Sequence, residues 1–583
     1  MARDRRATAQ GRRVRRRGTP MTGTRLGTTG RTRTTGARRP AWQVFLMAFL
    51  VIAAMAGSWA MTSPLESAPD EPAHTIHAAA VVRGEFIGDE SSVQRGASDV
   101  EVPAWAAQTS KLACFAFNPG IAANCQEPVT ESDAEQTATT SAGSYNPVYY
   151  AVVGLPSLVL DGKSALYAMR GVSLLWCSAL LALAVVALAG LRARGWALGA
   201  FAVAVTPMVL FILGSVNPSA LEISATVMLF CWLTLIAERR AARVAPAHAA
   251  AVAVSGALLA NTRSIALLWL LIVAVATLFD LRLLGRLVRS RTVWVAAAML
   301  AVAAVAGLAW TLGSNSLGEG VPYAGTGTSH LRGFVHMFAL TFQNSDGYIG
   351  LFGWIDTALP PSTVSLWGGL ILALTIGALV FGHGRRRFGV IVLAAAMVLV
   401  PPVVQGIAVT EYGYIWQARY VLAILACMVI AAGVALDHAF PHAFANSRVR
   451  WMFGLMLATL AVLHVHSSIW ALKRYVVGAH LGWRTMVTEP QWQPPLGWPV
   501  WVGVLTLAVV VGGLLVMRVA VAPAGPVTVD ASELAGLDDG RPPREPADAD
   551  EAFSDEAFSD DATADTAPTR TVAPADVPAP DVR

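Results

Sequence analysis

The chain has 583 residues, of which 55% are hydrophobic and 14% are charged, and its mean hydropathy is +0.53. This is far more apolar material than a soluble core requires, and it comes in blocks separated by arginines. The composition therefore excludes an ordinary soluble protein and predicts a polytopic membrane protein. The arginines flank apolar blocks without interleaved aromatic residues, so we expect no nucleic-acid partner.

The apolar blocks predict an all-α fold with about twelve membrane-spanning helices of roughly 20 residues each, within residues 41–520. They begin near Ala41, Leu166, Ala197, Pro218, Ala247, Ile265, Val293, Val364, Val390, Tyr420, Trp451 and Trp498. Arginine clusters occur at every second connection, as at Arg192 and Arg385. Because short cytoplasmic loops retain Lys and Arg, we expect a multi-pass protein of a bacterial plasma membrane with both termini in the cytoplasm.

Residues 1–40 are rich in arginine and nearly free of apolar side chains, so we expect a disordered basic cytoplasmic tail. The apolar run from Ala41 is too long for a signal peptide, and no small-residue cleavage site clearly follows it. It therefore predicts an uncleaved first span.

Three extracytoplasmic loops are predicted, at residues 62–147, 313–362 and 471–497, and loops of such length tend to carry function. The first loop begins with Asp70 and Glu71. A carboxylate there can accept the proton of an attacking hydroxyl, or the pair can bind a divalent cation. Neighbouring side chains diverge on an extended backbone, so we expect one of the two to act directly. Alternatively, Asp70 caps a helix that starts near Pro72, and Glu71 is solvated.

His74 and His77 share one helix face if Pro72 opens a helix. His74 can join Asp70 and Glu71 around a metal, or can contact a phosphate of the substrate. Solvated or interfacial histidines are the default, because no second cluster of ligands accompanies them. A divalent cation is thus the one cofactor that these residues suggest.

The rest of the first loop predicts three features. Cys114 and Cys125 can form a disulfide or remain two free thiols. The stretch 127–144 is rich in Thr, Ser, Ala and Glu and predicts a flexible insert. Tyr149 and Tyr150 then open a short apolar run that predicts a helix at the outer interface.

Further candidates lie at the outer ends of spans. Arg170 and Arg263 are candidates for contacting a phosphate. Glu222 follows the predicted Asn217 cap of the fourth span, and is either a functional intramembrane acid or an acid favoured by the helix N-terminus. In the second loop, Asp356 either orients an acceptor or is structural.

Arg419 lies at the outer mouth of the tenth span. There it can bind a lipid phosphate in a bidentate way, or can extend from a helix end towards the polar interface. Gln417 beside it is a further substrate-binding candidate. Residues 521–583 are rich in Pro, Ala, Asp and Glu and repeat the sequence Glu-Ala-Phe-Ser-Asp, so we expect a disordered acidic cytoplasmic tail. This tail either binds a cytoplasmic partner or is inert.

Four motifs in this order resemble the bacterial membrane-protein family catalogued as domain of unknown function 2142. They are Pro69-Asp70-Glu71-Pro72-Ala73-His74 with Gly84 downstream, Asn217-Pro218-Ser219-Ala220, Phe352-Gly353-Trp354-Ile355-Asp356 with Pro360, and Gln417-Ala418-Arg419-Tyr420. The resemblance covers roughly Ala41 to Met517. The chain departs from the family pattern at Ser219, where an acid is often expected, and at Ala418, where Gly is usual.

That family in turn resembles the C-type glycosyltransferases, which take a sugar from a polyprenyl-phosphate carrier at the outer face of the membrane. The resemblance implies a catalytic role for Asp70 and Glu71 and a donor-phosphate role for Arg419. We therefore expect an inverting cell-envelope glycosyltransferase, with a polyprenyl-phosphate-linked sugar and membrane lipid as its partners. The alternatives are a non-catalytic transporter or flippase for an envelope lipid or polysaccharide, and a scaffold acting through its tails.

Overall fold

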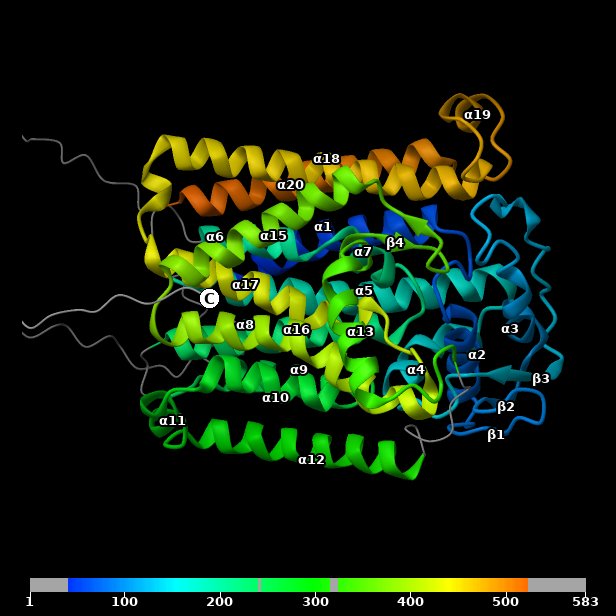
Figure 1. The fold of residues 1–583 in the computed structure, drawn as a ribbon, viewed down its shortest axis with the longest axis horizontal. Coiled ribbons are helices and arrows are strands. Elements are labelled where there is room, and N and C mark those ends of the chain that lie inside the picture. The colour runs from blue at the N-terminus through cyan, green and yellow to red at the C-terminus, as the bar shows by residue number, and fades with distance from the viewer. Residues whose placement is uncertain (1–39, 240–242, 315–322, 523–583) are drawn as a thin grey trace, which may run out of the picture. The chain divides into compact units, whose positions relative to one another are not determined.

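The computed structural model describes residues 40–239, 243–314 and 323–522, all within one compact unit of the chain, Met1–Leu534. The two predicted tails lie outside the described residues, apart from Pro40, Val521 and Ala522. The architecture is all-α, as predicted, with small sheets confined to the segments that connect the long helices (Figure 1).

Each of the twelve predicted apolar blocks contains a helix. The helices are α1 (Ala41–Thr62), α5 (Gly162–Ala189), α6 (Gly195–Ala204) with α7 (Pro207–Leu213), α8 (Pro218–Glu238), α9 (Pro246–Ala260), α10 (Ala266–Leu278), α12 (Arg291–Gly313), α15 (Pro361–Phe381), α16 (Gly384–Tyr412), α17 (Leu422–Ala439), α18 (Ser447–Val477) and α20 (Trp498–Val521). In the described part of the chain, nine helices are long and apolar enough to cross a membrane, or eleven if each of two bent pairs forms one span.

The count is lower than the predicted twelve because some blocks are broken or short. The α6–α7 pair bends by 66° where Thr206 caps α7 through Val209 N and Pro207 takes the first helical position. Helix α10 turns by 105° into α11 (Leu281–Leu287). The alanine-rich α9 has only 15 residues, which is less than a bilayer core requires.

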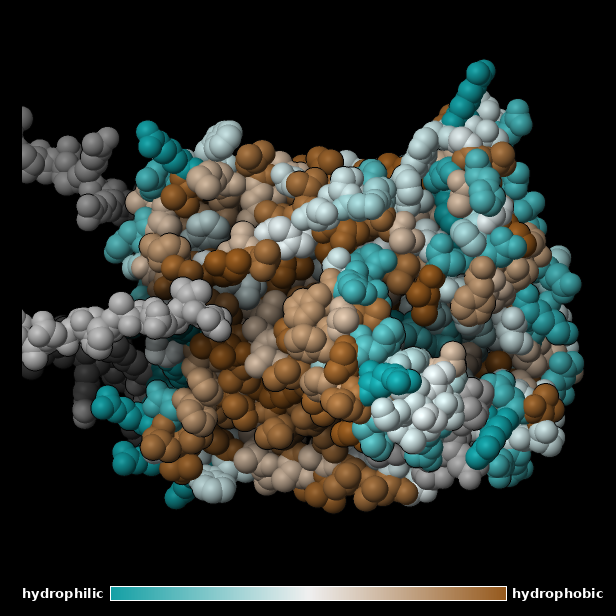
Figure 2. Space-filling view, viewed as in Figure 1, coloured by the Kyte–Doolittle hydropathy of each residue, from teal (hydrophilic) through white to brown (hydrophobic). Residues whose placement is uncertain are grey.

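The long helices alternate in direction, so their connections gather at two ends of the bundle (Figure 1). We call the end that carries residues 63–146 the loop end. The opposite end, which carries Arg192, Arg194, Arg385 and Arg450, is called the arginine end. Figure 2 shows hydrophobic residues across the middle of the visible face, over the helices, and hydrophilic residues towards both ends. Such a band is what lipid-facing helices require.

The first predicted loop folds into an ordered layer at the loop end. It contains α2 (Glu71–Val81), β1 (Asp89–Glu90), β2 (Ser98–Pro103), α3 (Ala104–Ala107), β3 (Glu135–Thr140) and α4 (Pro147–Val153), with short 3₁₀ turns at Gln108–Leu112, Ala123–Cys125 and Leu155–Leu158. The strands form an antiparallel sheet in the order β1-β2-β3, with Val100 opposite Ala138. The prediction of a flexible insert over 127–144 was wrong for β3, where buried Ala138 and Thr140 flank the less buried Thr139.

The second and third loops also contain regular structure. The second holds α13 (His330–Gln343), α14 (Asp346–Ile349) and a hairpin of β4 (Leu351–Phe352) and β5 (Thr357–Ala358), and the third holds α19 (Trp483–Thr488). Gly353 in the hairpin turn has φ +63°, and a Cβ there would lie 2.2 Å from Asp356 Oδ1. The turn therefore requires glycine at this position.

Candidate functional site

Asp70 occupies the N-terminal cap position of α2 in the left-handed conformation, with φ 65°. Its carboxylate forms no side-chain cap bond within the described chain, so the predicted capping role is wrong. Instead, Asp70 Oδ2 accepts a hydrogen bond from Arg419 Nη2 at 2.5 Å. The Asp70 side chain is 46% exposed, so solvent or a substrate can reach its carboxylate. Residues held in sparsely populated backbone conformations cluster at functional sites.

Glu71 points away from Asp70 and is completely buried. Its carboxylate accepts two hydrogen bonds from Arg170, both at 2.7 Å, in a bidentate pair. The backbone N–H groups of Val216 and Ala68 also donate to it, at 3.0 and 3.2 Å. The expectation of a solvated Glu71 was therefore wrong. With these partners, Glu71 joins the start of α2 to α5 and to the segment before α8.

All hydrogen bonds of the Arg170 guanidinium go to Glu71 and to the backbone at the end of α1. Besides Glu71, it donates to the carbonyl oxygens of Ala60, Ser63 and Pro64 at 2.7–2.9 Å. The side chain is 2% exposed. No N–H group is left for the predicted contact with a substrate phosphate, because the carbonyls at the end of α1 and the buried carboxylate use them all.

Arg419, by contrast, has unused donors. It lies in the 3₁₀ turn Ala418–Val421 before α17 and its side chain is 5% exposed. Among the described residues, neither Nε nor Nη1 of Arg419 has a hydrogen-bond partner, and the buried Oε1 of Gln417 has none either. Buried polar atoms without partners are costly and are rare in folded proteins. Such atoms beside a half-exposed carboxylate indicate a site prepared for a polar ligand.

A second guanidinium lies close to Arg419. Arg263 and Arg419 both pack against the ring of Tyr420, with guanidinium carbons 4.5 and 5.5 Å from its centroid. Arg263 also donates to Ser219 Oγ at 3.2 Å and lies 3.6 Å from Glu222 Oε2. Three of the four sequence motifs thus meet at Tyr420, although they are separated by up to about 350 residues along the chain.

Glu222 is held from two sides, because Trp269 Nε1 donates to its Oε1 at 2.5 Å while Arg263 neutralises it. The predicted cap of this helix is confirmed, since Asn217 Oδ1 accepts from Ser219 N at 2.9 Å. Glu222 is 2% exposed. Glu222 therefore positions Arg263. It can influence a substrate, as predicted, only through its effect on that arginine.

His74 and His77 are buried in α2, so the expectation of solvated or interfacial rings was wrong. The Nδ1 atom of His74 is hydrogen-bonded to the hydroxyl of Tyr150 at 2.9 Å, and the ring of His77 contacts that of Tyr150 edge-on. Burial lowers the pKa of His74 to about 3, although nearby Asp70 opposes the shift, and lowers the pKa of His77 to about 4. Both rings are therefore neutral at physiological pH.

The conditional metal site of Asp70, Glu71 and His74 is not assembled. Each of the three side chains faces a different partner, namely Arg419, Arg170 and Tyr150. Across residues 40–239, 243–314 and 323–522, no group of three or more His, Cys, Asp or Glu side chains is placed to hold a metal ion. Consecutive residues at the start of a helix diverge, which is why sequence proximity did not produce a cluster.

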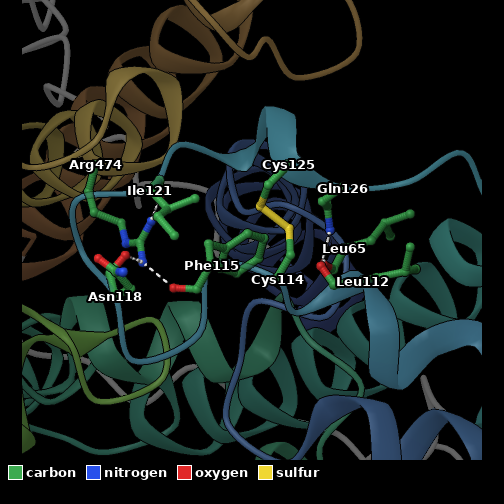
Figure 3. The surroundings of a disulfide bond; sticks show 9 residues. All are labelled: Leu65, Leu112, Cys114, Phe115, Asn118, Ile121, Cys125, Gln126 and Arg474. Carbon is green, nitrogen blue, oxygen red and sulfur yellow. Dashed lines mark hydrogen bonds between the residues drawn. A yellow bond between two sulfur atoms is a disulfide. The ribbon is translucent and has the colours of Figure 1, made fainter.

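Arg474, near the loop end of α18, anchors the first loop to that helix (Figure 3). Cys114 and Cys125 form a disulfide, which settles the open alternative of two thiols. Inside the loop that the disulfide closes, the carbonyl oxygens of Phe115, Asn118 and Ile121 accept hydrogen bonds from Arg474 at 2.7–3.2 Å.

Asp356 completes the same anchor. Its Oδ2 pairs with Arg474 Nη2 at 2.9 Å, and its Oδ1 accepts from Thr357 Oγ1 at 2.8 Å. The side chain is 6% exposed. Of the two interpretations of Asp356, the contacts support the structural one, and acceptor orientation stays a prediction.

We expect removal of the disulfide, by Cys114→Ser with Cys125→Ser, to lower the free energy of unfolding by about 2–3 kcal/mol, because a closed loop restricts the unfolded chain. Thermal unfolding of the purified protein with and without reductant measures the effect. Reductant should destabilise the unaltered protein and leave the double variant unchanged. An equal effect of reductant on both proteins would contradict the assignment.

Two contributors to the site were not predicted. Glu66 is 2% exposed, and burial together with neighbouring Glu71 raises its pKa well above the usual range. Arg474 was also missed, although its position in the third loop, which was predicted to be extracytoplasmic, was itself a signal, because Lys and Arg concentrate on the cytoplasmic side. Glu66 carried no such signal.

Fold and site together define a polytopic helical membrane protein with a charged, partly open site at one end of the bundle. The chain belongs to the family described as predicted membrane protein (DUF2142), whose model matches residues 47–428. The match includes both Asp70 and Arg419 and ends within α17, so α18–α20 lie beyond it. No curated protein matches the chain.

Proposed function

We propose that the protein is a cell-envelope glycosyltransferase that moves a sugar from a polyprenyl-phosphate donor to a glycan, lipid or protein acceptor at the outer face of the plasma membrane. The observation that carries the proposal is the Asp70–Arg419 pair. It combines a half-exposed carboxylate, suited to accept a proton, with a buried guanidinium whose Nε and Nη1 have no hydrogen-bond partner among the described residues. A carboxylate can act as a general base, and a guanidinium can bind a phosphate, so the pair offers both functions in one place.

The proposed orientation places the loop end outside the cell and both termini inside. Two observations support it. The Cys114–Cys125 disulfide belongs to the loop end, and disulfides persist in oxidising compartments. The opposite end carries Arg192, Arg194 and the cluster from Arg385, as the preference of cytoplasmic loops for basic residues requires.

In the proposed reaction, Asp70 accepts the proton of the acceptor hydroxyl as that oxygen attacks the anomeric carbon. A new carbon–oxygen bond forms with inversion, and the bond between the anomeric carbon and the phosphate oxygen breaks. The bonding electron pair leaves with the polyprenyl phosphate, whose negative charge Arg419 stabilises. Arg263, whose guanidinium also packs against the ring of Tyr420, adds positive charge at the same place.

The contact between Asp70 and Arg419 gives the site a means of coupling donor binding to catalysis. Arg419 Nη2 donates to the Asp70 carboxylate at 2.5 Å. A donor phosphate would compete for the guanidinium, because two oxygens of a phosphate match its fork of N–H groups. Asp70 would then be released towards the acceptor. Glu71, held by four hydrogen bonds, supports the backbone at this point.

The direct test uses the purified full chain with polyprenyl-phosphate-linked sugars extracted from cells that lack the gene, where the unused donor should accumulate. We expect release of polyprenyl phosphate together with glycosylation of an envelope acceptor. If the protein instead moves the intact labelled lipid across the bilayer of sealed vesicles with no release of phosphate carrier, the transporter alternative replaces this proposal.

Replacing Arg419 by Gln should lower kcat for the transfer by about 10²–10³-fold and raise KM for the lipid donor, because the departing phosphate loses its main charged partner. Arg419→Lys should recover only part of the loss, since an ammonium group cannot bind two phosphate oxygens as a planar fork. Steady-state kinetics against donor concentration measure both effects. Arg448→Gln, an exposed arginine at the arginine end, is the control. Full recovery by Lys, or an unchanged KM in Arg419→Gln, would contradict the phosphate role.

A further inference from the structure

A cavity of about 600 Å³ lies between α1, α5, α6, α18 and α20, away from the Asp70 site. It runs along α1 from Val44 to Met55, which is a distance of roughly 16 Å at 1.5 Å per residue. That distance is about half the thickness of the bilayer hydrocarbon core, or one leaflet. The lining is apolar except at Arg194 and Arg518, near the arginine end, and at His464, whose ring packs edge-on against Trp367.

A second, more polar cavity of about 280 Å³ adjoins the first at the arginine end. Arg194, Val519 and Ala522 line both cavities. The second cavity adds Arg192 and Arg450, so that three guanidinium groups surround it.

One carboxylate, Asp437, also lines the second cavity. Its two oxygens accept the backbone N–H groups of Trp196 and Ala197 at 3.0 and 2.8 Å. The negative charge of Asp437 is thus stabilised by the N-terminus of α6. The cavity therefore keeps an excess of positive charge.

We propose that the two cavities together form a binding site for an anionic phospholipid of the leaflet at the arginine end. The acyl chain occupies the apolar cavity, and the headgroup phosphate lies among Arg192, Arg194 and Arg450. An apolar channel one leaflet long, opening into a basic pocket, matches the shape and charge of such a lipid, and basic pockets between transmembrane helices are a known means of holding anionic headgroups. The site is independent of the proposed transfer reaction.

Two other occupants fit less well. Residues 1–39 are strongly basic, so the arginines would repel them. Residues 523–583 are acidic and follow Ala522 directly, but they are rich in Pro, Ala, Asp and Glu and lack the long apolar stretch that the larger cavity requires. A lipid satisfies the apolar and the basic cavity at once.

The headgroup is tested by binding of phosphatidylglycerol and of phosphatidylcholine, with identical acyl chains, to the full-length protein in detergent. Native mass spectrometry measures occupancy at increasing lipid concentration. We expect phosphatidylglycerol to bind more tightly. Arg192→Gln with Arg450→Gln should weaken its binding about 25-fold, at about fivefold for each arginine. Binding of phosphatidylcholine should not change, and Arg448→Gln, outside the pocket, should have no effect on either lipid.

The proposed position of the acyl chain is tested by filling the apolar cavity with a larger side chain. Ala461 lines the cavity on α18, whereas Ala458 on the same helix is exposed and does not line it. Ala461→Phe should weaken binding of both lipids about tenfold or more, since each excluded CH₂ costs about fourfold in affinity, while Ala458→Phe should bind normally. Equal affinity for the two lipids, or equal behaviour of the two phenylalanine variants, would overturn the proposal. So would phosphatidylglycerol binding that occurs only after residues 523–583 are deleted, which would assign the basic pocket to the acidic tail.

Discussion

Asp70→Asn is expected to reduce sugar transfer by about 10²–10⁴-fold, the usual contribution of a general base. An amide has the same shape as the carboxylate but does not accept a proton at neutral pH. Asn also tolerates the left-handed conformation that Asp70 adopts, with φ 65°. The Asp70 side chain is 46% exposed, and the amide oxygen of Asn can still accept the hydrogen bond from Arg419, so we expect only a small loss of stability. The variant should therefore fold normally and lose activity, which transfer assays and thermal unfolding of the same preparation measure.

A matched control is available at the start of α5. Asp161 also occupies a helix N-terminal cap position without a side-chain cap bond in the described structure, and it is exposed at the same end of the bundle. Asp161→Asn should transfer sugar at the normal rate. If Asp70→Asn retains activity within a factor of about two of Asp161→Asn, Asp70 is not the base and the proposed mechanism fails.

The sequence was sufficient to predict the helices, because a run of apolar residues long enough to cross a bilayer has few alternatives to helix. All twelve blocks, from Ala41 to Trp498, contain one. The sequence was less informative about how long each helix is and whether it is continuous. The break at Pro207 and the shortness of α9 reduce the count of spans, and α13 lies in a segment that was predicted as loop.

The candidate site could be predicted as a set of residues but not as a geometry. Asp70, Arg263 and Arg419 were all identified, yet nothing in the chain indicated that both arginines would pack against the ring of Tyr420. The predicted divergence of Asp70 and Glu71 is confirmed, because Asp70 contacts Arg419 whereas Glu71 contacts Arg170. It could be predicted because it depends on backbone geometry alone. Which acid would be buried could not be predicted, because that depends on Arg170, 99 residues further along the chain.

Because Glu71 and Arg170 form a fully buried ion pair, we expect changes at these two residues to have the largest effect on stability. We expect Glu71→Gln and Arg170→Gln each to lower the free energy of unfolding by about 3–5 kcal/mol, because either change leaves an unpaired charge or unsatisfied polar groups in a fully buried position. Yield and thermal unfolding in detergent measure the loss. Glu238→Gln provides the contrast: Glu238 pairs with Arg385 and Arg386, but its side chain is 20% exposed, so a smaller loss is expected.

The double variant Glu71→Gln with Arg170→Gln separates a structural role from a catalytic one. If the pair is structural, the double variant should be less destabilised than the sum of the single changes, because neither partner is left as an isolated charge. Activity should then follow the amount of folded protein in all three variants. A Glu71→Gln protein that unfolds at the normal temperature and has lost transfer would show the opposite. The buried acid would then be the catalytic one, and the four hydrogen bonds to its carboxylate would have to rearrange when substrate binds.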